Sequence, residues 1–149
     1  MVEKNSDYLE TRIKKLKAEN KSLRETTLLL KGEILKLKTA LRERDRLFNS
    51  IPAGVILIRN GKILETNELI LEQLGYRAEE VIGRDFLDLV HHDDEEYVRR
   101  LHNIWNSGKM APGQYDAHLV IREGGSIYCE VKVKRIRHKS RTAFLLNLI

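Results

Sequence analysis

Hydrophobic residues recur with alternating spacings of three and four through the first third of the chain. Leucine occupies every seventh position from residue 9 to residue 37, and a second series lies between these leucines. A hydrophobic period of 3.5 residues sustained over several heptads is typical of a left-handed coiled coil. One helix cannot bury such a stripe alone, so the pattern predicts a partner helix, most simply that of a second copy. The predicted dimer interface consists of Leu9, Ile13, Leu16, Asn20, Leu23, Thr27, Leu30, Ile34, Leu37, Leu41 and Phe48.

The residue types in this stripe favour two parallel strands. Leucine at d positions with isoleucine at a positions is typical of parallel dimers. Asn20 lies at an a position, where a pair of buried amides fixes register and dimeric state at some cost in stability. A parallel register also places Glu19 of one copy opposite Arg24 of the other, and Glu33 opposite Lys38. We therefore predict a parallel homodimer.

Two hypotheses for the role of this helix remain open. It serves only to join two copies, or it also carries a signal along the rod. A third class, the basic-zipper DNA binders, needs a basic recognition region before the zipper. Lys4 is the sole basic residue before Leu9, so the sequence predicts no direct contact with nucleic acid.

After residue 48 the pattern changes from helical to strand-like, and Pro52 helps to end the helix because the residue before a proline disfavours helical geometry. Residues 1–48 are therefore assigned to the coiled coil and residues 49–149 to a separate domain. Strands are predicted at 55–58, 62–66, 114–122, 126–138 and 141–149, and helices or helical turns at 67–74, 78–81, 85–89 and 91–106. This order predicts an α+β domain with an antiparallel sheet.

Two of the predicted strands, 55–58 and 143–149, are apolar on both faces. An antiparallel sheet normally has one solvent-facing side with polar residues, as the alternation in 126–135 indicates for that strand. We therefore expect the outer face of the two apolar strands to be covered. The end of the first helix, residues 41–48 of the same or the partner chain, is the predicted cover.

Charge and composition limit the class of protein. The net charge of +5 belongs to the helix, since residues 1–48 hold 13 Lys and Arg against 8 Asp and Glu, whereas the remainder holds 14 of each. Such charges are usually a solvated coiled-coil surface. No apolar run is long enough for a membrane span, the first residues are polar, and a single cysteine excludes an internal disulfide framework. The expected location is the cytoplasm.

Residues 47–149 resemble a PAS domain, the sensor module common in bacterial and archaeal signalling proteins. LFNSIPAGVILIRNGKILETN is similar to the opening strands of that family, with Asn67 at its usual asparagine. EQLGYRAEEVIGRDFLDLVHHDDEE is similar to its short helices, and IREGGSIYCEV to its later hairpin. The resemblance implies a five-stranded sheet with the first and last strands adjacent at its centre. It also implies a signal-sensing role in a histidine kinase, cyclase or transcriptional regulator, whose output domain lies outside this chain. The alternative is a structural dimerisation or protein-interaction unit.

A ligand of such a domain would lie between the sheet and the helices. The few inward polar groups predict a small, mostly apolar ligand. A filled hydrophobic core without ligand is the alternative. The predicted lining is Leu71, Leu74, Phe86, Leu89, Leu101, Trp105, Leu119, Val131, Leu145 and Asn147, with Asn147 the one inward polar group of the last strand.

No cofactor or metal site is predicted. His102 is on the long helix, where haem-binding members of the family place their iron ligand, but a stripe of Tyr97, Leu101, Ile104 and Trp105 would leave it at the rim. The photosensing flavin members need a cysteine motif on the preceding helices, and Cys129 instead lies on a strand, facing inward. The acidic run after His92 is interpreted as a helix cap, with Asp93 as N-cap. No set of residues for catalysis is evident, so the chain is not expected to be an enzyme.

Overall fold

The computed structural model describes all 149 residues, in two units that comprise residues 1–46 and 47–149. Helix α1 spans Val2–Asn49, so that its last residues belong to the second unit. None of the residues of α1 is buried. No helix is both long enough and apolar enough to cross a membrane.

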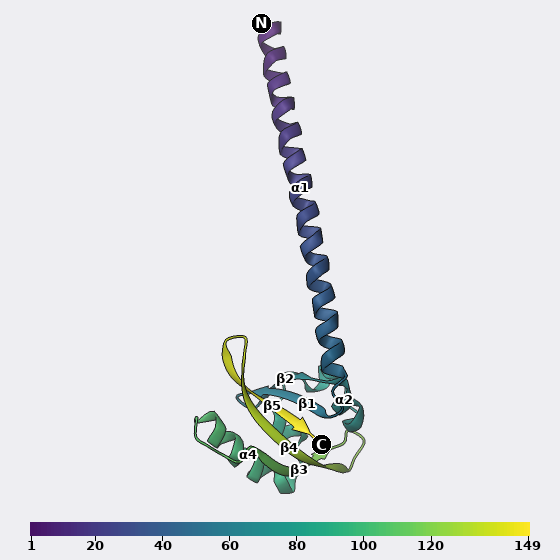
Figure 1. Cartoon of the computed structure of the whole chain (residues 1–149), viewed down its shortest axis with the longest axis vertical. Helices are drawn as coiled ribbons and strands as arrows, with labels where there is room; N and C mark the ends of the chain where they lie inside the picture. Colours follow the sequence, from purple (N-terminus) through teal and green to yellow (C-terminus); the bar gives the residue numbers. More distant parts are fainter. The chain divides into compact units, whose positions relative to one another are not determined.

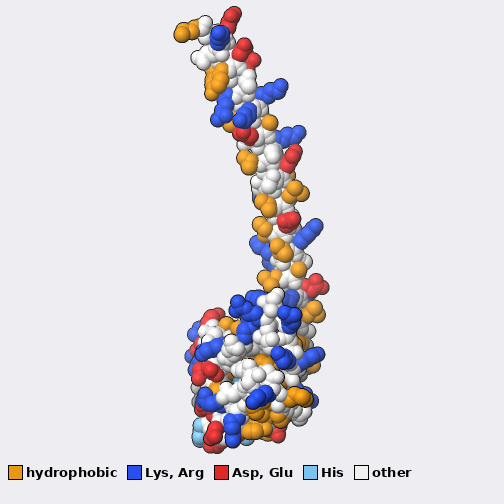
Figure 2. Space-filling view, turned by 90° about the vertical axis from the view of Figure 1, so that its left-hand side faces the viewer, with side chains coloured by type: hydrophobic (Ala, Val, Ile, Leu, Met, Phe, Trp, Pro, Cys, Tyr) orange, Lys and Arg blue, Asp and Glu red, His pale blue; other side chains and the backbone are white.

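The first unit is a single helix whose apolar stripe is uncovered. The aliphatic side chains at the predicted a and d positions up to residue 41 are 41–70% exposed. Figure 2 shows hydrophobic side chains along the helix, between lysines, arginines and acidic residues. A contiguous apolar stripe of this length on a helix surface is typical of a site that a partner helix covers.

The second unit has the predicted order of elements, which Figure 1 shows as a sheet with short helices beside it. The sheet order is β2-β1-β5-β4-β3 and every pairing is antiparallel, so the first and last strands are adjacent near its centre, as predicted. The strands are β1 (Gly54–Arg59), β2 (Lys62–Thr66), β3 (Gln114–Val120), β4 (Ser126–His138) and β5 (Arg141–Leu148). The helices are α2 (Glu68–Leu74), α3 (Ala78–Val81), the 3-10 turn η1 (Phe86–Leu89) and α4 (His92–Asn106).

One face of the sheet carries the hydrophobic core. Ile56 and Ile58 of β1 point to this face, and so do Phe144, Leu146 and Leu148 of β5. The same cluster includes the buried hydrophobic residues of every helix of this unit. The core therefore lies between the sheet and one layer of helices, which is the arrangement expected of an α+β domain.

The opposite face of the two central strands is also shielded. Val55, Leu57 and Ala143 lie on this outer face and are only 1%, 5% and 0% exposed. Burial of this face confirms that it is covered. Phe48, at the end of α1, is half-buried within the same unit. The earlier part of the predicted cover, residues 41–46, belongs to the other unit and stays a prediction.

Asn67 ties the start of the sheet to the first short helix. Its side chain is fully buried, accepts a hydrogen bond from the Val55 N–H at 2.9 Å and donates one to the Ala53 carbonyl at 2.8 Å. Helix α2 starts at the next residue and ends at Gly75, whose positive φ of 73° closes the helix as predicted. The asparagine thus fixes both the entry into β1 and the start of α2.

Candidate functional site

The interior predicted as a pocket is largely filled by its own side chains. One continuous core cluster contains seven of the ten predicted lining residues, and Leu71 packs against it. These seven are Leu74, Phe86, Leu89, Leu101, Trp105, Leu119 and Val131. Whether any of them contacts a ligand remains a prediction.

Two predicted lining residues face the wrong way. Leu145 and Asn147 pair with Leu57 and Val55 on the outer face of the sheet, whereas Leu146 points into the core. Side chains alternate along a strand, so choosing the wrong phase moves every residue to the other face. The prediction of Asn147 as an inward polar group is therefore wrong, and β5 offers no inward polar side chain between Phe144 and Leu148.

The buried stripe of α4 also differs from the prediction. It consists of Val98, Leu101, His102 and Trp105, which have the i, i+3, i+4, i+7 spacing of a single helix face. Tyr97 is 44% exposed, so its assignment to this stripe is wrong. The stripe is rotated toward His102, which is a core residue and not a rim histidine.

His102 lies among aromatic rings. Its ring stacks on Phe86 at a centroid distance of 5.4 Å and lies 5.2 Å from the Trp105 ring. Its Nε2 is 3.5 Å from the Tyr115 hydroxyl, whereas its buried Nδ1 has no hydrogen-bond partner. Burial lowers the pKa of His102 to about 4, against a weaker opposing effect of Asp85, so the ring is neutral at pH 7. The absence of haem chemistry at this residue stays a prediction.

The start of α4 is a capped helix end. The N-cap residue is His91, whose Nδ1 accepts a hydrogen bond from the Asp93 N–H, so the prediction of Asp93 as N-cap is wrong by two residues. Asp94 accepts a hydrogen bond from the backbone N–H of His118 at 2.7 Å, and the same carboxylate oxygen lies 2.9 Å from His118 Nδ1. The His118 N–H is the main cause that lowers the pKa of Asp94. His91, His92 and Asp93 lie close together, with the Asp93 carboxylate 3.5 Å from His91 Nδ1 and 3.0 Å from His92 Nε2, and the absence of a metal there stays a prediction.

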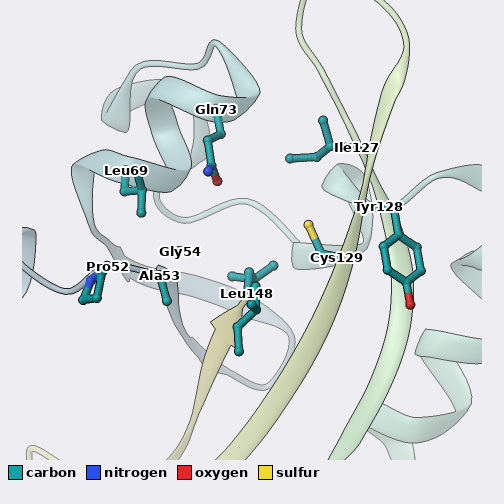
Figure 3. Close-up of a pocket in the computed structure, with 10 residues that line it drawn as sticks. Pro52, Ala53, Gly54, Leu69, Gln73, Ile127, Tyr128, Cys129 and Leu148 are labelled. Carbon is teal, nitrogen blue, oxygen red and sulfur yellow. The ribbon is translucent and has the colours of Figure 1, made fainter.

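A groove of about 430 Å³ separates α2 from the ends of β4 and β5. Figure 3 shows Cys129 with its sulfur toward the space between Gln73 and Leu148. Cys129 is a buried core residue, as predicted, and burial raises the pKa of its thiol. A thiol with a raised pKa is a poor nucleophile, so this groove has no evident reactive group. Its walls are mainly apolar, with Pro52, Leu69 and Ile127 among them.

A second hollow lies at the opposite end of the sheet, where α4 stops. Cavities of about 230 Å³ and 130 Å³ share Trp105, Gly108, Arg135 and Phe144 in their walls. The Trp105 and Phe144 rings are 5.9 Å apart and inclined by 31°. The larger cavity adds Lys109, Met110, Ala111, Gly113 and Val133, and the smaller one adds Asn60, Asn106 and Thr142. We call the two cavities together the Trp105 cleft.

Residues 42–149 match the family model of the PAS fold. The chain belongs to the PAS fold family. The match covers the sheet, all of the short helices and the last turns of α1. It confirms the resemblance that the order of motifs predicts.

Solved PAS domains have the same architecture. The PAS domain of an HTR-like protein from Haloarcula marismortui superimposes with a TM-score of 0.66 at 23% identity, covering 80% of this chain and 98% of that one. A PAS domain from a two-component sensor histidine kinase has a TM-score of 0.53 at 13% identity, covering 75% and 96%. At these identities the likeness shows the shared fold alone.

Among curated proteins, hypoxia-inducible factor 1-alpha of Gallus gallus is 28% identical over 67 residues. The match covers 44% of this chain, and the chain spans only 8% of the length of that relative. The similarity therefore covers less than half of the chain.

Of the residues that line the Trp105 cleft, only Trp105 was among the predicted pocket residues. Arg135 follows the alternating run of β4, where inward positions are Cys129, Val131 and Val133. Continuing the alternation by one step places Arg135 on the inward side, and its pairing with Phe144 confirms this. The alternation of β4 has an arginine where an apolar residue is expected, and this was the sequence signal that could have indicated the cleft.

Proposed function

We propose that this chain is a dimeric sensory module of a signal-transduction protein, in which a parallel coiled coil joins two PAS domains. The observation that carries the proposal is the continuous exposed stripe of α1 next to a complete PAS fold. The occurrence of this fold in a protein described as a sensor histidine kinase supports the signalling role. The output domain and the cytoplasmic location are part of the proposal.

The dimer is supported by the order of residues along α1. Leu23, Leu30 and Leu37 are 53–70% exposed although they are among the most apolar side chains of the helix. Pairing two copies in parallel would bury them against each other and would bring the two Asn20 amides together. Burial of such side chains contributes roughly 1.5–3 kcal/mol each relative to full exposure, so pairing of the stripe favours the dimer.

The proposal also includes coupling between the PAS domain and the coiled coil. A ligand that binds one arrangement of the sheet more tightly shifts the population of that arrangement. In this proposal the shift reaches α1 at the outer face of β1 and β5, where Val55 and Leu57 are buried, and Phe48 at the end of α1 is half-buried in the same unit. The helix would then transmit the shift as a change in rotation or register.

A structural dimerisation unit without a ligand is the second candidate. The filled core between α4 and the sheet favours it, since the predicted apolar pocket holds protein side chains. The same coiled coil would form in either case, so the dimer alone does not separate the two. Saturable binding of a small molecule to the PAS domain does.

Disulfide trapping tests the parallel dimer. In a Cys129→Ser background, Leu23→Cys places a thiol at a d position, where the two copies of a parallel in-register pair approach closely enough for a disulfide. Mild oxidation should then convert most of the chain to a covalent dimer. Lys21→Cys, two residues away on the outer side of the helix, is the control and should react slowly. Equal trapping of the two variants would contradict the parallel register.

A further inference from the structure

We propose that the Trp105 cleft binds a small anion with a flat apolar body, such as an aromatic carboxylate. The inference rests on the proposed sensory function and names the chemistry of its ligand. The proposed ligand differs from the apolar core ligand that the sequence predicts. The Trp105 cleft lies at the edge of the hydrophobic core, and its rim carries cationic side chains. Trp105 and Phe144 supply the apolar wall, and Arg135 and Lys109 supply the charge.

By register Arg135 lies on the same face of the sheet as the core, at the end of that face where its side chain is exposed. It lies directly opposite Phe144 in the β4–β5 pair, and Phe144 in turn packs beside Trp105. Arg135 lines both cavities together with Trp105 and Phe144, so its exposed guanidinium lies at the edge of an apolar wall. A guanidinium offers two parallel N–H donors that match the two oxygens of a carboxylate.

No carboxylate of the protein neutralises this rim. Neither cavity has an aspartate or glutamate in its walls, and neither Arg135 nor Lys109 forms an ion pair within the chain. Asp85, which lies beside Gly61 near the smaller cavity, accepts a hydrogen bond from the Leu87 N–H as the cap of η1. Two unpaired cations at the edge of a low-dielectric wall attract an anion more strongly than the same charges on an open surface.

The space is suitable for one aromatic ring. An apolar protein cavity of roughly 150 Å³ accepts benzene, and the larger part of the cleft measures about 230 Å³. A ring lying against Trp105 and Phe144 would stack in the offset manner that aromatic groups prefer. Asn60, Asn106 and Thr142 in the smaller cavity can form hydrogen bonds with a polar substituent. The cleft therefore offers an apolar wall for a flat ring and cationic side chains for a negative charge.

The lone tryptophan of the chain reports on this cleft. Trp105 is the only tryptophan, so a titration of the full chain with benzoate can be followed by its fluorescence. Benzamide is the neutral probe of the same shape, and acetate is the anion without a ring. We expect a saturable change with benzoate and a weaker response, by about tenfold in affinity, with either of the others.

Charge variants complete the test. Arg135→Gln and Lys109→Gln should each weaken benzoate binding, with about a tenfold loss for the arginine. Lys134→Gln is the matched control, because this lysine directly precedes Arg135 in β4 and lies on the other face, opposite Leu145. Equal binding of benzoate and benzamide, unchanged affinity in both charge variants, or no saturable signal in the wild type would overturn the proposal. Light scattering on the same samples measures whether the chain is a dimer, which depends on α1 and not on the cleft. A dimer that does not bind benzoate would therefore overturn this proposal and leave the proposed dimeric module intact.

Discussion

Asn67 and Val55 are joined by two hydrogen bonds, one through a side chain and one through the backbone. The Val55 N–H donates to the Asn67 Oδ1 at 2.9 Å, and the Asn67 N–H donates to the Val55 carbonyl at 3.0 Å. The link holds residue 55 of the central strand against the start of α2. The fully buried amide has no water to replace these partners.

Asn67→Ala should therefore destabilise the PAS domain by about 2–4 kcal/mol, because it leaves the Val55 N–H and the Ala53 carbonyl without partners. Urea unfolding followed by Trp105 fluorescence measures the loss. Asn103→Ala, at an exposed position of α4, is the control and should change the free energy of unfolding little. A loss below about 1 kcal/mol for Asn67→Ala would show that solvent satisfies both groups.

His102 should make the stability depend on pH. Burial lowers its pKa from 6.5 to about 4, so the unfolded chain takes up this proton first as the pH falls. Its contribution is complete above pH 6.5 and is lost between pH 6.5 and about pH 4, by up to about 1.4 kcal/mol per pH unit.

The contribution of His102 is measured by comparing urea unfolding at several pH values in the wild type and in His102→Phe. The variant should have a smaller loss of stability over this pH window. His92→Gln is the matched control, since the His92 side chain is 80% exposed, and its pH dependence should follow the wild type. Identical pH profiles for the wild type and His102→Phe would mean that this histidine is not held neutral.

The β4–β5 turn holds two residues in an unfavourable backbone conformation. Lys139 and Ser140 have φ values of 48° and 63°, in the left-handed region that favours glycine or asparagine. Ser140→Gly should thus stabilise the domain by roughly 0.5–1 kcal/mol, visible as a higher melting temperature in circular dichroism. Ser126→Gly, at the start of β4, has no such strain to relieve and should lower the melting temperature. The same response to both changes would argue against strain at the turn.

The order of elements could be predicted because turn and cap residues mark nearly every boundary. Asn60–Gly61 has positive φ at both residues of the first hairpin, and Gly75 ends α2. The alternation of Cys129 and Val131 with polar neighbours gave the correct face of β4. These are local signals, and they do not depend on the rest of the fold.

The faces of β5 and α4 could not be predicted in the same way. β5 is apolar on both sides, so the sequence has no polar marker that separates Leu145 from Leu146, and only the strand register assigns them. On α4 the ring of Tyr97 resembles a core residue in sequence, although the buried stripe includes His102 instead. The Trp105 cleft could not be predicted either, because only the strand register brings Arg135 opposite Phe144.

The solution mass of the full chain tests the dimeric module most directly. Ile34 is an a-position residue and Leu35 is its neighbour outside the stripe, and their side chains are 50% and 66% exposed. Multi-angle light scattering of the wild type and of Leu35→Asp should give twice the chain mass of 17.4 kDa, whereas Ile34→Asp should shift the mass toward 17.4 kDa. A wild-type mass of 17.4 kDa at all concentrations, or an equal effect of both substitutions, would contradict a coiled-coil dimer built on this stripe.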